Sequence, residues 1–176
     1  MISLRVKNIR GVTVLELAVV VVIILILATM LLPISAGIRA RADEASCAAN
    51  LKNLYIGASA YLDSKGSWPQ ISNSLIKADP QTYAQQWVAA LLPFGITHVT
   101  WICPSIQRLR GEPISGIDDP STYRVDYIGM AFDEKQTSPK PANPFPWFIE
   151  IAGMHDRGNL IILSNGTMSS LSDMSH

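Results

Sequence analysis

Residues 17–32 read LAVVVVIILILATMLL, and this apolar stretch decides how the rest of the chain is interpreted. Thr29 is the only polar residue in it. Between Val12 and Ile38 the chain carries a single charged side chain, Glu16. A helix that crosses a membrane needs about 20 predominantly apolar residues. The sequence therefore predicts one membrane-spanning helix near the N-terminus.

Basic residues precede this stretch, at Arg5, Lys7 and Arg10, and no acidic residue lies before Glu16. Such a bias predicts a cytoplasmic N-terminus, with the rest of the chain exported. A cleaved secretory signal peptide is the alternative, because small residues follow at 35–37. However, the apolar core of a signal peptide has only about 7–15 residues.

The composition excludes several classes of protein. The 176 residues suffice for about one domain. Charged residues make up 16% of the chain, which is too few for a solvated disordered protein. The formal net charge is zero, so the basic footprint of a nucleic-acid binder is missing. Two cysteines cannot form a disulfide-dense scaffold.

The apolar stretch opens with the sequence RGVTVLE at residues 10–16. An ionised Glu16 inside a bilayer costs about 3 kcal/mol unless it is paired. The junction resembles the prepilin signal of type IV pilins and type II secretion pseudopilins. That resemblance implies cleavage after Gly11 by prepilin peptidase and N-methylation of Val12, although Phe is usual at that place. It also implies that Glu16 meets the N-terminus of a neighbouring subunit and sets the axial register, and that Pro33 kinks the long helix.

A purely structural alternative exists for Glu16, whose carboxylate can reach out to the membrane interface. Removal of the leader also changes the electrostatics. The mature chain from Val12 has 165 residues, with 11 basic and 14 acidic side chains. We therefore expect a mildly acidic protein that does not bind nucleic acid.

Apolar residues continue at helical spacing beyond the membrane stretch, at Cys47, Leu51, Leu54, Ala58 and Tyr61. They form one face of an amphipathic helix. The pattern predicts a helix from about Val12 to Leu62, roughly 75 Å long at 1.5 Å per residue. The predicted parts are a leader at 1–11, a transmembrane or filament-core half-helix at 12–38, and an exported globular domain at 39–176.

A narrower resemblance rests on Cys47-Ala48-Ala49-Asn50-Leu51-Lys52, on Cys103-Pro104-Ser105, and on His155 followed by Asn165-Gly166. These segments are similar to pseudopilin-like proteins of Planctomycetes and Verrucomicrobia, which end in an H-x9-DG motif. Here Asn165 replaces the Asp, which casts doubt on any role that needs a carboxylate. We interpret His155 as structural, for example bonding the hairpin backbone, with a metal-ligand role as the alternative.

The sequence of the globular part predicts several short helices and strands. Asn-Gly between apolar runs favours a two-residue hairpin turn, since both residues need positive φ. The predicted elements are a short helix at 87–93, strands at 99–103, 123–132 and 147–152, a loop at 133–146, and a hairpin with strands at 159–163 and 168–171.

Two cysteines in an exported domain favour a Cys47–Cys103 disulfide, which would enclose about 56 residues. Two buried thiols are the alternative. Calcium is a weaker expectation, because the available acids match no specific loop. Those acids are Asp118, Asp119, Asp126, Asp133 and Glu134. No GxSxG, HExxH or Walker sequence occurs, so we expect no enzymatic activity, and a Cys103–His155 nucleophile is only an alternative.

We therefore expect an α+β fold in which one long N-terminal helix packs on a small antiparallel sheet, as in pilins. The resemblance implies a structural subunit of a type II secretion pseudopilus or type IV pilus-like filament. It would be a single-pass inner-membrane protein with its C-terminal domain in the periplasm or outside the cell, and without a cofactor. Its partners would be prepilin peptidase, homologous subunits, the assembly platform and the membrane. The alternatives are an adhesive or DNA-uptake pilin, and a membrane-anchored module that binds carbohydrate or a partner.

Overall fold

The computed structural model describes residues 12–111, 119–131, 144–151, 155 and 158–173, without the side chains of residues 30–36. The chain divides into two compact units, Met1–Arg39 and Ala40–His176. Helix α1 spans Val14–Lys65 and so contributes to both. It ends at Lys65, three residues beyond the predicted boundary, and the next residue is Gly66, whose φ of 70° suits only glycine without strain.

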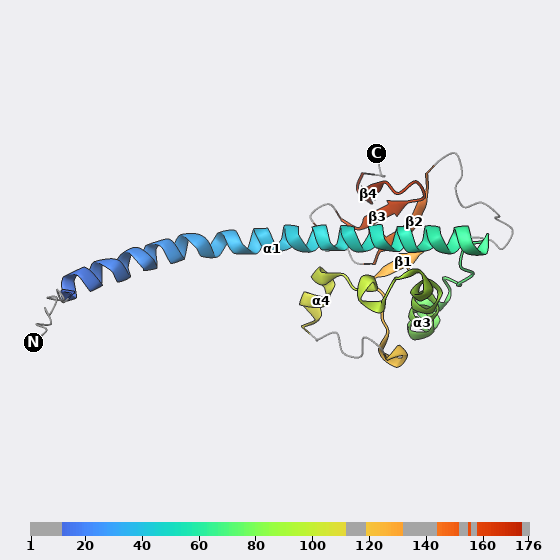
Figure 1. Ribbon diagram of the computed structural model, residues 1–176, viewed down its shortest axis with the longest axis horizontal. Helices are drawn as coiled ribbons and strands as arrows, with labels where there is room; N and C mark the ends of the chain where they lie inside the picture. The colour runs from blue at the N-terminus through green and yellow to red at the C-terminus, as the bar shows by residue number, and fades with distance from the viewer. Residues whose placement is uncertain (1–11, 112–118, 132–143, 152–154, 156–157, 174–176) are drawn as a thin grey trace, which may run out of the picture. The chain divides into compact units, whose positions relative to one another are not determined.

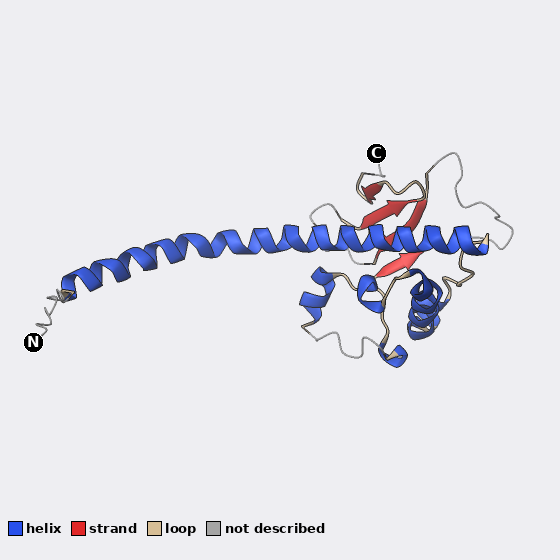
Figure 2. Ribbon diagram, in the orientation of Figure 1, coloured by secondary structure: helices blue, strands red, loops and turns tan. Residues whose placement is uncertain are grey.

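The second unit is α+β (Figures 1 and 2). Its strands form one antiparallel sheet in the order β1-β2-β3-β4. Their bounds are β1 Tyr127–Gly129, β2 Pro146–Glu150, β3 Leu160–Leu163 and β4 Met168–Ser170. The helical elements after α1 are α2 Leu75–Ala78, α3 Pro80–Leu91, η1 Leu92–Phe94, η2 His98–Trp101, α4 Pro104–Arg110 and η3 Pro120–Thr122.

Helix α3 is longer than the short helix predicted at 87–93. It starts at Pro80, a residue whose fixed φ suits the first helical position. Asp79 precedes it, and its side chain accepts a 3.1 Å hydrogen bond from the backbone N–H of Thr82. This Asp-Pro pair is a helix-start signal that places the beginning seven residues before Trp87.

The strand predicted at 99–103 is wrong. Residues His98–Trp101 form η2, and Cys103 is the extended residue that precedes α4. The apolar run reads like a strand because Trp101, Ile102 and Cys103 are all buried. They are buried beneath neighbouring elements instead of along a sheet.

The strand predicted at 123–132 is shortened to β1, Tyr127–Gly129. Just before it, the backbone of Asp126 bonds outside the ladder, to Trp101 O and Ile151 N at 2.8 and 2.9 Å. The strand predicted at 147–152 is confirmed as β2, one residue earlier and ending at Glu150. Most of the predicted loop at 133–146 lies outside the described residues.

The predicted C-terminal hairpin is confirmed as β3 and β4, but its turn differs. Among the described residues only glycines have positive φ, so Asn165 is not left-handed and Gly166 is, at 79°. The Gly166 N–H donates to Leu163 O, and the Leu163 N–H donates to Thr167 O. This is a three-residue loop in which glycine takes the left-handed place.

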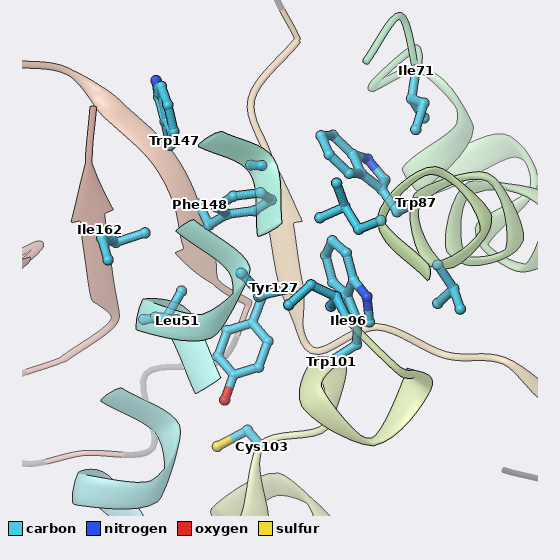
Figure 3. Packing of buried hydrophobic residues seen from close by; sticks show 14 of the residues in the cluster. Leu51, Ile71, Trp87, Ile96, Trp101, Cys103, Tyr127, Trp147, Phe148 and Ile162 are labelled. Atoms are coloured by element: carbon cyan, nitrogen blue, oxygen red, sulfur yellow. The ribbon is translucent and has the colours of Figure 1, made fainter. Parts of the chain in front are cut away.

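The predicted apolar face of α1 lies inside the second unit. Cys47, Leu51, Leu54 and Ala58 are completely buried. Figure 3 shows Leu51 between Ile162 of β3 and Tyr127 of β1, with the rings of Trp87, Trp101 and Phe148 nearby. A disulfide joins Cys47 to Cys103, as predicted. The buried face of α1 therefore packs against the sheet, and the disulfide joins the same face to the segment before α4.

Among the residues that the structure describes, no helix has an apolar stretch of sufficient length to cross a bilayer. The prediction of a single-pass inner-membrane protein, which rested on residues 12–38, is wrong on this finding.

The disulfide yields the first testable prediction. Replacing Cys47 and Cys103 together by Ala should lower the free energy of unfolding by about 2–4 kcal/mol, because the open chain regains the entropy of a loop that spans 56 positions. Urea unfolding followed by tryptophan fluorescence measures it. A dithiol reductant should shift the wild type similarly and leave the double variant unchanged. Equal midpoints for oxidised wild type and variant would contradict a stabilising bridge.

Candidate functional site

Four chemically reactive side chains meet in the interior of the second unit. Cys47 comes from α1, Cys103 from the start of α4, Glu150 from the end of β2, and His155 from the segment after β2. Each offers one ligand-type atom, and these atoms all lie within 4.8 Å of one another. We call this set the Cys–Glu–His cluster. It is the densest collection of such groups in the described part of the chain.

Two contacts hold the cluster together beside the disulfide. Glu150 Oε1 lies 3.1 Å from His155 Nε2 and 2.9 Å from Cys103 Sγ. The other carboxylate oxygen, Oε2, accepts a 3.3 Å hydrogen bond from the Leu160 backbone N–H. One oxygen is thus tied to the sheet, and the other is directed at the sulfur and the imidazole.

Secondary structure explains why these residues converge. Cys47 begins the inward face of α1, which is buried along its length. Pro104 starts α4 and leaves Cys103 extended beside that face. Glu150 pairs with Tyr127 across the β1–β2 ladder, and both are completely buried. The chain therefore places a carboxylate where the sheet alternation calls for an apolar side chain.

The electrostatics of Glu150 follow from this burial. Loss of solvent raises the pKa of its carboxyl, while the charge of His155 and the N–H of Leu160 oppose that rise. Asp126 adds a nearby negative charge and strengthens it. A buried carboxylate is stable only with a partner, and His155 is the partner that this site supplies.

A layer of charged groups supports the cluster from the α4 side. Asp126 Oδ2 accepts a 2.9 Å hydrogen bond from the Cys103 backbone N–H. The guanidinium of Arg124 lies 3.1 Å from each oxygen of the same carboxylate and also donates to Gln107. These bonds fix the backbone of Cys103 and neutralise Asp126.

The acids expected to bind calcium are not brought together among the described residues. Asp126 is engaged by Arg124 and Cys103, and Asp119 accepts from the N–H and hydroxyl of Ser121 at the start of η3. Asp118, Asp133 and Glu134 lie outside the described residues.

The C-terminal residues singled out from the sequence separate into two places. His155 lies against Glu150, not against the hairpin turn. Asn165 caps the turn, where its Oδ1 accepts a 2.9 Å hydrogen bond from the Thr167 N–H. The replacement of Asp by Asn keeps this acceptor. A Cβ on Gly166 would lie 3.1 Å from the ring of Tyr55, so a side chain there would be crowded as well as strained.

The processing residues lie at the start of the first unit. Gly11 is outside the described residues, and Val12 is 76% exposed. Pro33 lies within the helical backbone of α1. Glu16 accepts from the backbone N–H and the hydroxyl of Thr13, both at 2.9 Å, and its own N–H donates to the Thr13 hydroxyl. These bonds lower the pKa of Glu16.

Sequence reasoning missed Thr13, Glu150 and His98. Thr13-x-x-Glu16 is a capping box and was readable as such. Glu150 was readable only as a charge at the end of an apolar strand. His98 carried no signal, yet its imidazole Nε2 lies 2.8 Å from Arg124 O and 3.1 Å from Arg124 N, so it joins η2 to the segment before β1.

Two further candidates for ligand binding are a hollow and the four tryptophans, and neither brings together reactive groups as the cluster does. A hollow of about 630 Å³ is bordered by Tyr83, Ile106 and Tyr123, with Arg124 and Asp126 at its edge. All four tryptophans are at most 1% exposed. None of them offers a ring face for stacking against a sugar.

Comparison with protein-family models, with curated proteins and with solved structures finds no match for this chain.

His98 yields a prediction for pH dependence. Burial lowers its pKa from 6.5, and the charge of Arg124 acts in the same direction, whereas the hydrogen bond to the Arg124 backbone and the charge of Asp126 oppose this shift. The unfolded chain therefore binds this proton first, so stability is complete above about pH 6.5 and is lost as the pH falls through the folded-state pKa. In His98→Gln, which keeps an acceptor for the Arg124 N–H, this part of the acid sensitivity should disappear. Parallel urea midpoints for both proteins from pH 7.5 downwards would contradict it.

Proposed function

We propose that this chain is a structural subunit of a pilin-like filament, of the type IV pilus or type II secretion pseudopilus kind. Prepilin peptidase would cleave it after Gly11 and methylate Val12. The first half of α1 would form the filament core with homologous subunits, and the second unit would be the head that faces outward. In this proposal the chain acts by assembly and performs no catalysis.

The observation that carries the proposal is the exposure of the first half of α1. The large apolar side chains from Val12 to Leu27 are between 48% and 85% exposed. Monomeric proteins rarely expose contiguous apolar surface beyond a few hundred Å². A helix that is apolar on every side needs cover on every side. One groove covers one side only, whereas helices of several copies of the same chain can surround it.

The start of α1 supports a role in assembly. Thr13 and Glu16 satisfy each other in the isolated chain, with the Glu16 carboxylate exposed. Cleavage after Gly11 would create an α-amino group four residues before that carboxylate. A neighbour's amino group could then pair with Glu16 without burying a lone charge, and such a pair is a means of fixing register.

The second half of α1 supports separate roles for the two halves of this helix. Its inward face is buried with the sheet, and the disulfide joins it to the segment before α4. The head therefore has its own core, which does not depend on residues 12–29. A subunit needs this separation, because the head must remain folded when the first half of α1 changes partners.

Two substitutions of Glu16 test the proposal. Glu16→Gln keeps the capping interaction with Thr13 and removes the charge, whereas Glu16→Ala removes both. If Glu16 pairs with a neighbour's amino terminus, both variants should be cleaved after Gly11 and neither should form filaments. Electron microscopy of cells that express the chain with prepilin peptidase and the assembly machinery measures filament formation, and mass spectrometry measures cleavage.

The Gln variant separates the two roles of Glu16. Wild-type filament numbers for Glu16→Gln, with loss only in Glu16→Ala, would show that capping is its whole role. Normal filaments from both variants would contradict the pairing. His98→Gln, which alters only the head, is the matched control and should assemble normally.

A further inference from the structure

We propose that the Cys–Glu–His cluster is a zinc site when the Cys47–Cys103 disulfide is reduced. The four ligands would be the two thiolates, one oxygen of Glu150 and the imidazole of His155. A bound zinc ion and the disulfide would then be alternative ways of linking Cys47 to Cys103 in the head.

The donor set suits zinc. Zn²⁺ takes four ligands in a tetrahedron and prefers thiolate and imidazole, with carboxylate also accepted. Calcium and magnesium require oxygen ligands, which this cluster does not provide in number. All four donors are buried or nearly so, which is typical of a closed structural site.

The geometry needs only a small adjustment. Zinc–ligand distances of about 2.0–2.3 Å place tetrahedral ligand atoms about 3.3–3.8 Å from one another. The atoms of the cluster already lie within 4.8 Å, from four different segments of the chain. When the disulfide opens, the two sulfurs move apart, and the ion occupies the space between them.

Surrounding hydrogen bonds already orient the ligands. The Leu160 N–H holds Glu150 Oε2, which leaves Oε1 directed at His155 and Cys103. Asp126 holds the backbone of Cys103, and Arg124 holds Asp126. Second-shell partners of this kind are what fix the orientation of metal ligands.

The contact between Cys103 Sγ and Glu150 Oε1 is the strongest single argument. A disulfide sulfur carries no proton, and neither does an ionised carboxylate, so this 2.9 Å contact lacks a donor when both are in those states. A thiol of Cys103 would donate to the carboxylate. A zinc ion would satisfy both atoms and His155 at once.

The chemical balance is simple. A dithiol reductant transfers two electrons and two protons to the Cys47–Cys103 bond and becomes a disulfide itself. The two thiols of the chain then bind Zn²⁺ as thiolates and release their two protons to solvent, and His155 binds as the neutral imidazole, so that a charged His155 releases one further proton. The zinc-bound cluster has two thiolates and one carboxylate around a doubly charged cation, so its buried negative charge is largely neutralised.

Cobalt provides the direct test, because tetrahedral Co²⁺ with thiolate ligands absorbs visible light strongly. The full chain, kept in solution by a mild detergent, is reduced under argon, freed of reductant and titrated with Co²⁺. We expect one Co²⁺ per chain, a thiolate-to-metal absorption band, and loss of both on addition of Zn²⁺. The oxidised wild type, with the same sequence, should give no such spectrum.

Variants assign the ligands. His155→Gln and Glu150→Gln should each weaken Co²⁺ binding by at least about 10-fold, since even a second-shell loss has that effect. His98→Gln replaces a buried histidine outside the cluster and should bind as the wild type does. The proposal would be overturned if His155→Gln and Glu150→Gln bound Co²⁺ as strongly as the wild type does. It would also be overturned if the reduced, folded wild type showed no stoichiometric binding.

A second measurement needs no variant. X-ray absorption at the zinc edge of the reduced wild type should show two sulfur and two nitrogen or oxygen neighbours. A shell of sulfur alone, or of oxygen alone, would overturn the proposed ligand set. Circular dichroism of every sample establishes that the proteins compared are folded.

Discussion

Burial of one face of α1 is the constraint on which the head depends. Leu51 and Leu54 lie on that face among residues from the sheet and from α3, and Cys47 fastens it to Cys103. Gly57 and Gly129 show how close the packing is, because a Cβ at either position would overlap Ile96 or Trp87. The helix supplies the surface against which the short strands and short helices become a core.

The same helix has an opposite character in its first half. There the apolar side chains are exposed around the whole circumference, so the isolated chain leaves a long hydrophobic surface in contact with water. Self-assembly is the proposed means of covering it. A single chain would thus carry a packed core in its second unit and, in residues 12–27, an apolar surface that still needs cover. The disulfide lies entirely within the second unit.

The pattern of the sequence predicted some of this and missed the rest. The α1 face and the β3–β4 hairpin were predictable because helical spacing and an Asn-Gly turn are local signals. The disulfide was predictable because the chain has two cysteines and so one possible pairing. The strand at 99–103 was wrong, since a buried apolar run looks the same in a strand and in a 3-10 helix. The Cys–Glu–His cluster was invisible as a whole, because its members come from four segments that only tertiary packing unites.

Intact-mass measurement of the protein isolated from its own cells tests the central claim most directly. The filament account predicts a chain that begins at Val12 and is one methyl group heavier than its sequence. That result would show that the exposed half of α1 is released for assembly by prepilin processing. A chain that retains residues 1–11 would contradict the account.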